Sequence, residues 1–107
     1  SLAYDALPEA EVYAFPNPAR ESAVIRFRSP LYPMEAEVLV FDIAGVLVKE
    51  FKGSELASPS PGVYHAQWAL TNGRGEGVAS GVYLFSVKVK GANGVSGRVV
   101  KKIAVVR

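Results

Sequence analysis

One histidine and a few scattered carboxylates are the side chains best suited to chemistry in this sequence of 107 residues. His65 alternates with Tyr64 and Ala66 in a strand-like pattern that points it away from the core. Because the chain has no second imidazole and no cysteine, it offers no zinc-ligand set, and no Ser-His-Asp arrangement follows from the spacing. We therefore predict that His65 is an ordinary exposed strand residue.

The remaining candidates for catalysis or ligand binding are weaker. The spacing of the carboxylates does not suggest a paired acid and base, because they are spread over different turns. They are Asp42, Glu50, Glu55 and Glu76. The glycine-rich residues 73–77 precede a strand rather than opening a helix, so they lack the helix N-terminus that phosphate cradles use. We interpret them as a wide hairpin loop and Ser80 as a turn residue. No catalytic, cofactor-binding or metal site is predicted.

The charge distribution is uneven, although the net charge is only +2. The last acidic residue is Glu76, and six cations follow it: Lys88, Lys90, Arg98, Lys101, Lys102 and Arg107. These cations either pair across strands with Glu11, Glu35 and Glu37 or form a basic strip that meets an acidic partner or lipid head groups. Nucleic-acid binding is not expected, because the aromatic residues of the last third lie on one face of the strand and its lysines, Lys88 and Lys90, lie on the other.

The elements that must position these residues are strands. Residues 81–90 alternate strictly, with large apolar side chains at Tyr83, Phe85, Val87 and Val89, and the opposite face is expected to become wet towards its C-terminal end, from Ser86 onward. Since seven prolines and ten glycines interrupt every helical pattern, the chain contains no good helix signal. The same alternation over 63–68 predicts that Trp68, the single tryptophan, faces inward beside this strand.

The other strands follow from patterns and turns. Residues 22–28 read as a half-buried strand, 36–43 as a nearly continuous apolar strand, 46–51 as its hairpin partner and 98–107 as the closing strand. Asp42 and Gly45 predict a tight turn, and residues 91–94 predict a hairpin turn with Asn93 and Gly94 at its centre. Residues 16–18, Pro-Asn-Pro, indicate an edge segment, and 53–62 an irregular crossover between sheets.

About seven short strands at turn spacing are typical of an all-β, immunoglobulin (Ig)-like β-sandwich. We predict a linker or N-terminal arm at 1–10 and one domain at 11–107. No apolar run approaches the roughly 18 residues of a membrane span, and the first residues lack the pattern of a signal peptide. Exposed Tyr32, Leu39 or Val82 could form a carbohydrate-stacking or protein-docking patch.

Four ordered motifs over nearly the whole chain resemble one family. They are residues 13–20 (Tyr-Ala-Phe-Pro-Asn-Pro-Ala-Arg), 41–45 (Phe-Asp-Ile-Ala-Gly), Trp68 followed by Gly75 and by 78–83 (Val-Ala-Ser-Gly-Val-Tyr), and the basic end 101–107. Together they look like the C-terminal sorting domains of the type IX secretion system of Bacteroidetes-type bacteria. They are also similar to the Ig-like domain of flagellar hook-capping proteins. The family usually has Asp-Gly directly after the tryptophan, whereas this chain has Ala69-Leu70.

The resemblance implies a non-catalytic β-sandwich that ends a secreted protein. Such a domain is read by the outer-membrane translocon and its sortase-like component, reaches the cell surface through the periplasm, and is often removed while the cargo is attached to surface lipopolysaccharide. It implies recognition by residues that match the family pattern: Lys101, Lys102, Arg107, Gly81 and Tyr83. It also implies that Val38 and Val40, rather than Leu39 and Phe41, face the core.

We expect an upstream cargo domain, a monomer, no cofactor and no integral membrane segment. Two other interpretations stay open. The chain could be a structural or carbohydrate-binding accessory module of a multidomain extracellular enzyme or adhesin, or an assembly scaffold like the hook-capping domain.

Overall fold

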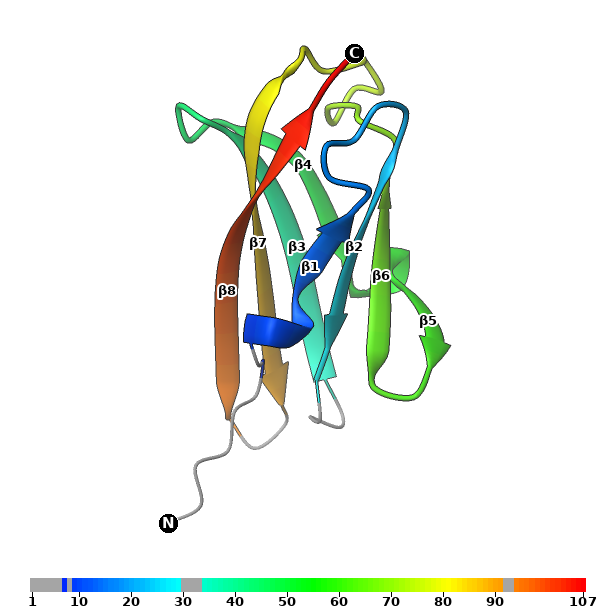
Figure 1. Ribbon diagram of the computed structural model, residues 1–107. Coiled ribbons are helices and arrows are strands. Elements are labelled where there is room, and N and C mark those ends of the chain that lie inside the picture. The colour runs from blue at the N-terminus through cyan, green and yellow to red at the C-terminus, as the bar shows by residue number, and fades with distance from the viewer. Residues whose placement is uncertain (1–6, 8, 30–33, 92–93) are drawn as a thin grey trace.

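The computed structural model is a sandwich of two antiparallel four-stranded β-sheets (Figure 1). It describes residues 7, 9–29, 34–91 and 94–107. The elements are η1 (Glu9–Glu11), β1 (Tyr13–Phe15), β2 (Ala23–Arg28), β3 (Met34–Asp42), β4 (Leu47–Lys52), η2 (Gly53–Glu55), β5 (Ala57–Ser60), β6 (Val63–Trp68), β7 (Gly81–Gly91) and β8 (Ser96–Val105). The two η elements are short 3-10 helices, and the described residues contain no α-helix. The predicted all-β sandwich is confirmed.

Sheet A has the strand order β1-β2-β6-β5. Its inner face comes from the strict alternation of β2, in which Ala23, Ile25 and Phe27 are buried. β1 lies at the edge of this sheet, as the prolines that follow it predict.

Sheet B has the order β4-β3-β7-β8. β7 is central, and Tyr83, Phe85, Val87 and Val89 are all buried, which confirms the predicted inner face of this strand. Along β3 the buried residues are Val38 and Val40, as the family resemblance implies.

Trp68, the last residue of β6, belongs to the hydrophobic core and is fully buried. Its indole ring meets the Tyr83 ring edge to face, with 5.6 Å between centroids. The indole Nε1–H donates to the Thr71 carbonyl at 2.8 Å, so its one polar atom is satisfied. The predicted inward orientation of Trp68 is confirmed, and this ring joins β6 of sheet A to β7 of sheet B.

The turn between β3 and β4 has the predicted chemistry. The Asp42 carboxylate accepts backbone N–H bonds from Ala44 and Val46, both at 2.9 Å. Gly45 has a φ of +86°, a conformation that suits glycine. Residues 72–77, predicted as a wide loop, are closed by a similar device, because the Asn72 side-chain oxygen accepts N–H bonds from Arg74 and Glu76 at 2.9 and 3.1 Å.

Three expectations about strands need correction. Residues 53–62 do cross from sheet B to sheet A, but they include η2 and the edge strand β5, which brings the described residues to eight strands, one more than the predicted seven or so. An edge strand tolerates Pro59 because its free N–H side needs no ladder bond. Ser86, on the outer face of β7, is buried rather than wet, because Arg98 of β8 lies over it with a 3.1 Å bond from Nε to Oγ. Finally, Gly94 donates to the Gly91 carbonyl, so it ends the β7–β8 turn and does not lie at its centre.

The first described residues pack against the sandwich. Leu7, within the predicted arm, is 3% exposed, and Val12 is fully buried in the same core. The division at residue 10 stays a prediction. Residues 29–33, with Pro30 and Pro33, predict a break after the strand at 22–28. The part of this break at 30–33, the exposure of Tyr32 and the conformation of Asn93 lie outside the described residues.

Candidate functional site

The five residues implied to be recognised all lie on β7, on β8 or just after it, at the C-terminal side of sheet B. The structure brings them onto two neighbouring strands but gives them different environments. The two on β7 illustrate this: Gly81 begins the strand and is exposed, whereas Tyr83 is only 7% exposed. The Tyr83 hydroxyl donates to the Ala79 carbonyl at 2.7 Å, so this side chain fixes the start of β7 from inside.

Arg107 is held by the loop between β6 and β7 rather than standing free. Its guanidinium donates to the carbonyls of Leu70 at 2.6 Å and Val78 at 2.7 Å, and its backbone N–H donates to the Ser80 hydroxyl at 2.8 Å. A Cβ on Gly77 would lie 3.3 Å from the guanidinium, so the missing side chain there leaves room for it. We call these contacts the Arg107 clamp. A part for Arg107 in recognition stays a prediction.

Lys101 and Lys102 point to opposite faces of sheet B, as neighbours on a strand must. Lys101 is paired with Phe85, an inner-face residue, and its ammonium donates to the Glu9 carbonyl of η1 at 2.8 Å. Lys102 is paired with Leu84 on the outer face and is exposed. Its ammonium has no hydrogen-bond or ion-pair partner among the residues that the structure describes. Neither lysine is locked inside the core.

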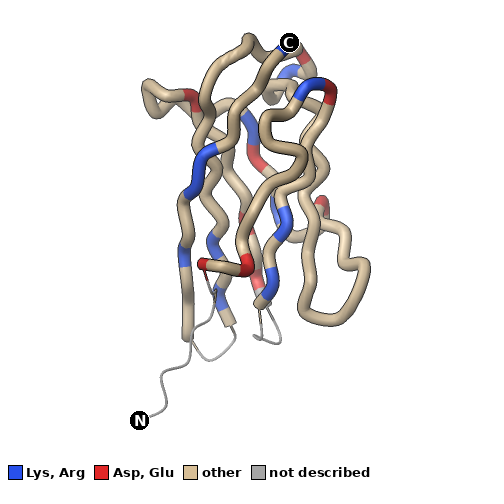
Figure 2. Tube along the Cα trace, in the orientation of Figure 1, with Lys and Arg blue, Asp and Glu red and all other residues tan. Residues whose placement is uncertain are grey.

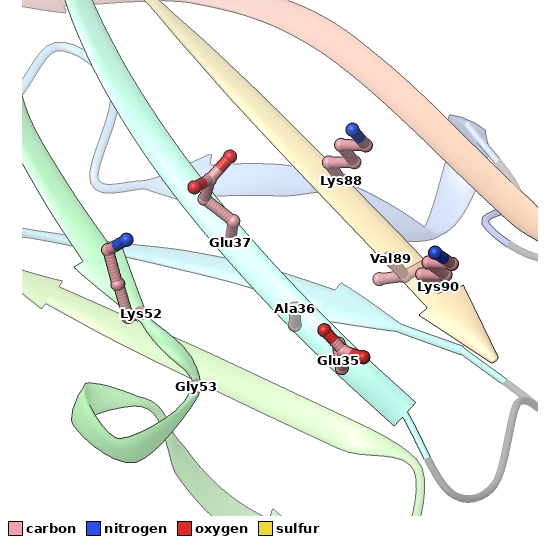
Figure 3. A pocket seen from close by; sticks show the side chains of 8 residues that line it. All are labelled: Glu35, Ala36, Glu37, Lys52, Gly53, Lys88, Val89 and Lys90. Carbon is pink, nitrogen blue, oxygen red and sulfur yellow. The ribbon is translucent and has the colours of Figure 1, made fainter. Parts of the chain in front are cut away.

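Two other cations of the last third, Lys88 and Lys90, have acidic cross-strand neighbours. In the β3–β7 ladder Lys88 is opposite Glu37 and Lys90 is opposite Glu35. Figure 3 shows these four side chains around an open hollow that Lys52 of β4 also lines. Figure 2 shows the charges of β7 at its lower end, while the upper part of this strand is uncharged. Lys88 is also opposite Arg98 of β8, and among the described residues no ion pair joins Lys88 or Lys90 to these glutamates, so both the pairing interpretation and the basic strip stay predictions.

The upper half of the same outer face carries several apolar side chains. Phe41 lies between Leu47 and Leu84 in one row, whereas Leu39 lies between Glu50 and Ser86 in the next. We define the apolar half-face by six residues: Leu39, Phe41, Leu47, Val82, Leu84 and Val100. Leu47, Val82 and Val100 are 50, 41 and 49% exposed. Exposed apolar side chains gathered on one face make this half-face a candidate interaction surface.

Lys102 borders the apolar half-face in the row of Leu84 and Phe41. Three of the sequence motifs thus place a residue on this surface: Phe41 from the second, Val82 from the third and Lys102 from the basic end. From the sequence, Leu39 and Val82 could be identified as exposed candidates, but not as neighbours on the same surface. The missing information was the register between β3, β7 and β8, which sets non-local neighbours.

The Pro-Asn-Pro motif covers the free edge of β8. The Asn17 side chain accepts a bond from the Ala104 N–H at 3.0 Å and donates to the Lys102 carbonyl at 3.4 Å. Ala19 then donates to the Ala104 carbonyl and accepts from the Val106 N–H, both at 2.8 Å. The motif therefore serves as a short substitute strand that orders the backbone around Lys102.

His65 differs from its prediction, because it is half-buried rather than exposed. The Phe15 ring from β1 meets the imidazole edge to face at 6.4 Å, and Nε2 is buried with no hydrogen-bond partner in the described part of the chain. The pattern within β6 could not show this cover, which comes from another strand. Among the described residues no group of three or more histidines, cysteines and carboxylates could hold a metal ion. In the same residues, none of the helices has the length and hydropathy to cross a membrane.

Solved structures share this fold. No protein-family model and no curated protein matches the chain. The crystal structure of dimeric latent PorU from Porphyromonas gingivalis matches 89% of the chain with 33% identity and a TM-score of 0.70. PorZ, a surface component of the type IX secretion system of the same organism, matches 92% with 24% identity and a TM-score of 0.57. The cell-surface-expressed, multi-modular chitinase ChiW from Paenibacillus sp. matches 97% with 17% identity and a TM-score of 0.64. The chain spans only 9, 12 and 9% of these three structures, respectively.

The fold and its exposed face define the chain as an Ig-like β-sandwich module, of the kind found within much longer surface-associated proteins. The neighbours confirm the resemblance drawn from the motifs: the chain is similar to the Ig-like C-terminal domains of the type IX secretion system.

Proposed function

We propose that this chain is a non-catalytic C-terminal secretion and sorting domain, which directs a secreted cargo protein through the type IX outer-membrane translocon to the cell surface. The observation that carries the proposal is the convergence of Phe41, Val82 and Lys102, from three separate motifs, on one exposed face. The likeness to PorU and PorZ supports the same system.

The physical argument rests on what this face offers a partner. Burying apolar area contributes about 25 cal/mol per Å², and the apolar half-face supplies such area without unfolding the domain. Lys102 adds a cation that no described group neutralises, so it can select an acidic surface and increase the rate of encounter. The translocon and its sortase-like component are the partners that we propose for this face, and the cargo is the upstream domain.

A fusion of residues 1–107 to the C-terminus of a periplasmically exported reporter tests the proposal in a type IX-competent host. We expect the reporter to appear at the cell surface, measured by protease accessibility and antibody labelling of intact cells. The control is the same reporter without the domain, which should stay in the periplasm. A reporter that carries the domain, folds and still stays in the periplasm would contradict the sorting function.

A second function, an accessory module that binds carbohydrate, is favoured by a different surface. Tyr13 and Phe15 on the outer side of sheet A are 40 and 41% exposed, with ring centroids 5.8 Å apart. Arg26 lies over the Tyr13 ring at 5.9 Å. Exposed rings beside a planar hydrogen-bond donor suit a sugar ring and its hydroxyls. Glycan-array binding that is lost in the Tyr13→Ala/Phe15→Ala variant would favour this function over sorting.

A further inference from the structure

The free edge of β8 is closed over only part of its length. β8 is the edge strand of sheet B, and residues 17–19 bond to it at Lys102, Ala104 and Val106. These contacts use the Lys102 carbonyl, both backbone groups of Ala104 and the Val106 N–H. Even-numbered residues of this strand therefore direct their backbone groups away from β7.

The same alternation of backbone direction continues along β8 towards Ser96, because the β7–β8 ladder runs from Val105 to Ser96 without a register shift. The N–H and C=O groups of Arg98 and Val100 consequently point to the free edge as well. Within the described part of the chain, no backbone or side-chain group bonds to them. Residues 96–101, which we call the open edge, thus present two donors and two acceptors in the geometry of a β-ladder.

We propose that the open edge binds an extended acidic segment of another protein, which adds to sheet B as a further strand. Strand addition draws affinity from backbone bonds and specificity from alternate side chains. On the outer face the open edge carries Arg98 and Val100, Lys102 lies directly beyond its end within reach of a long side chain, and the sequence contains no acidic residue after Glu76. The best partner therefore has an acidic, an apolar and an acidic residue at alternate positions.

Charge also argues against a second copy of this chain as the occupant. Two open edges paired with each other would bring Arg98 and Lys102 of one copy next to the same cations of the other, and like charges facing each other are destabilising.

A designed peptide tests this interaction with the whole chain in solution. The probe is Thr-Glu-Thr-Val-Thr-Glu-Thr with blocked ends, and the control peptide has lysine in place of both glutamates. We expect the acidic peptide to shift the NMR signals of the Arg98 and Val100 amides and to slow their hydrogen exchange. Its dissociation constant should be at least about tenfold lower than that of the basic peptide, and binding should weaken with added salt.

Val100→Pro provides the sharpest variant, because proline removes an outward N–H and no bond of the β7–β8 ladder. It should weaken binding of the acidic peptide by about tenfold or more. Val100→Ala, which keeps the N–H, should bind within about threefold of the unaltered chain. If Val100→Pro does not fold, Arg98→Glu replaces it, with the expectation that the preference between the two peptides is reversed or lost.

Three results would overturn the proposal: equal binding of both peptides, unchanged binding by Val100→Pro or Arg98→Glu, or Arg98 and Val100 amides already protected from exchange in the free chain. The proposal does not depend on the sorting function. Peptide binding with failed export would support the open-edge proposal and contradict the sorting function. Export without peptide binding would support the sorting function and contradict the open-edge proposal.

Discussion

Replacement of Trp68 by alanine is expected to lower the free energy of unfolding by about 3–5 kcal/mol. The ring is fully buried between the two sheets, packs on Tyr83 and donates to the Thr71 carbonyl. Its removal leaves a cavity and an unpaired carbonyl in the same place. Since domains of this size are stable by only about 5–15 kcal/mol, the variant should be close to unfolding near physiological temperature.

Urea denaturation followed by circular dichroism measures this loss. The control is Val106→Ala, a side chain that is 37% exposed, which should change the free energy of unfolding by less than about 0.5 kcal/mol. A Trp68→Ala protein within about 1 kcal/mol of the unaltered chain would show that the tryptophan is not what holds the two sheets together.

Arg107→Ala is expected to cost about 1–2 kcal/mol, although Arg107 itself is exposed. The Arg107 clamp donates charge-assisted bonds to two carbonyls of the β6–β7 loop, and the bond to Leu70 is partly buried. We place the value below that of two fully buried charged bonds because solvent screens the bond to Val78. The expected consequence is a looser connection before Gly81 rather than global unfolding.

Two variants separate the clamp from simple loss of charge. Arg107→Lys keeps the charge but lacks the planar fork that reaches both carbonyls, so it should recover less than half of the lost stability. Arg74→Ala removes a cation from the exposed tip of the same loop and should be nearly neutral. Denaturation curves and hydrogen exchange of the Val78 amide, which bonds to the Leu70 carbonyl, would report both effects. Equal stability of Arg107→Ala and Arg74→Ala would contradict a structural clamp.

Much of the fold could be predicted because strands reveal their faces through a period of two. This rule placed the inner face of β7 and the burial of Trp68 correctly, and turn chemistry located Asp42 and Gly45. The apolar run through Val38 and Val40 has no alternation, so its inner face came from the family resemblance instead. β5 was missed because proline and serine disfavour strands in general, while an edge position removes the main objection to Pro59.

The surface was harder to predict because its neighbours are distant in sequence. The opposite orientations of Lys101 and Lys102 follow from strand geometry alone and could have been inferred. The Arg107 clamp could not, since its partners lie 29 and 37 residues away on an irregular loop. The side chains that cover Ser86 and His65 likewise come from other strands, Arg98 from β8 and Phe15 from β1, so no local sequence pattern could predict this burial.

We propose that the secretion machinery recognises the outer face of sheet B, with Lys102 at its border. The most direct measurement is the surface fraction of a reporter fused to the unaltered chain, to Lys102→Ala and to Lys52→Ala, in the same type IX-competent host. Lys52 lies on the same face but in its charged half, beside Glu50 at 3.4 Å, and is a matched loss of one exposed lysine. We predict that Lys102→Ala lowers the surface fraction by about threefold to tenfold while Lys52→Ala leaves it unchanged. Equal export of all three fusions, or an equal loss in both variants, would contradict the claim.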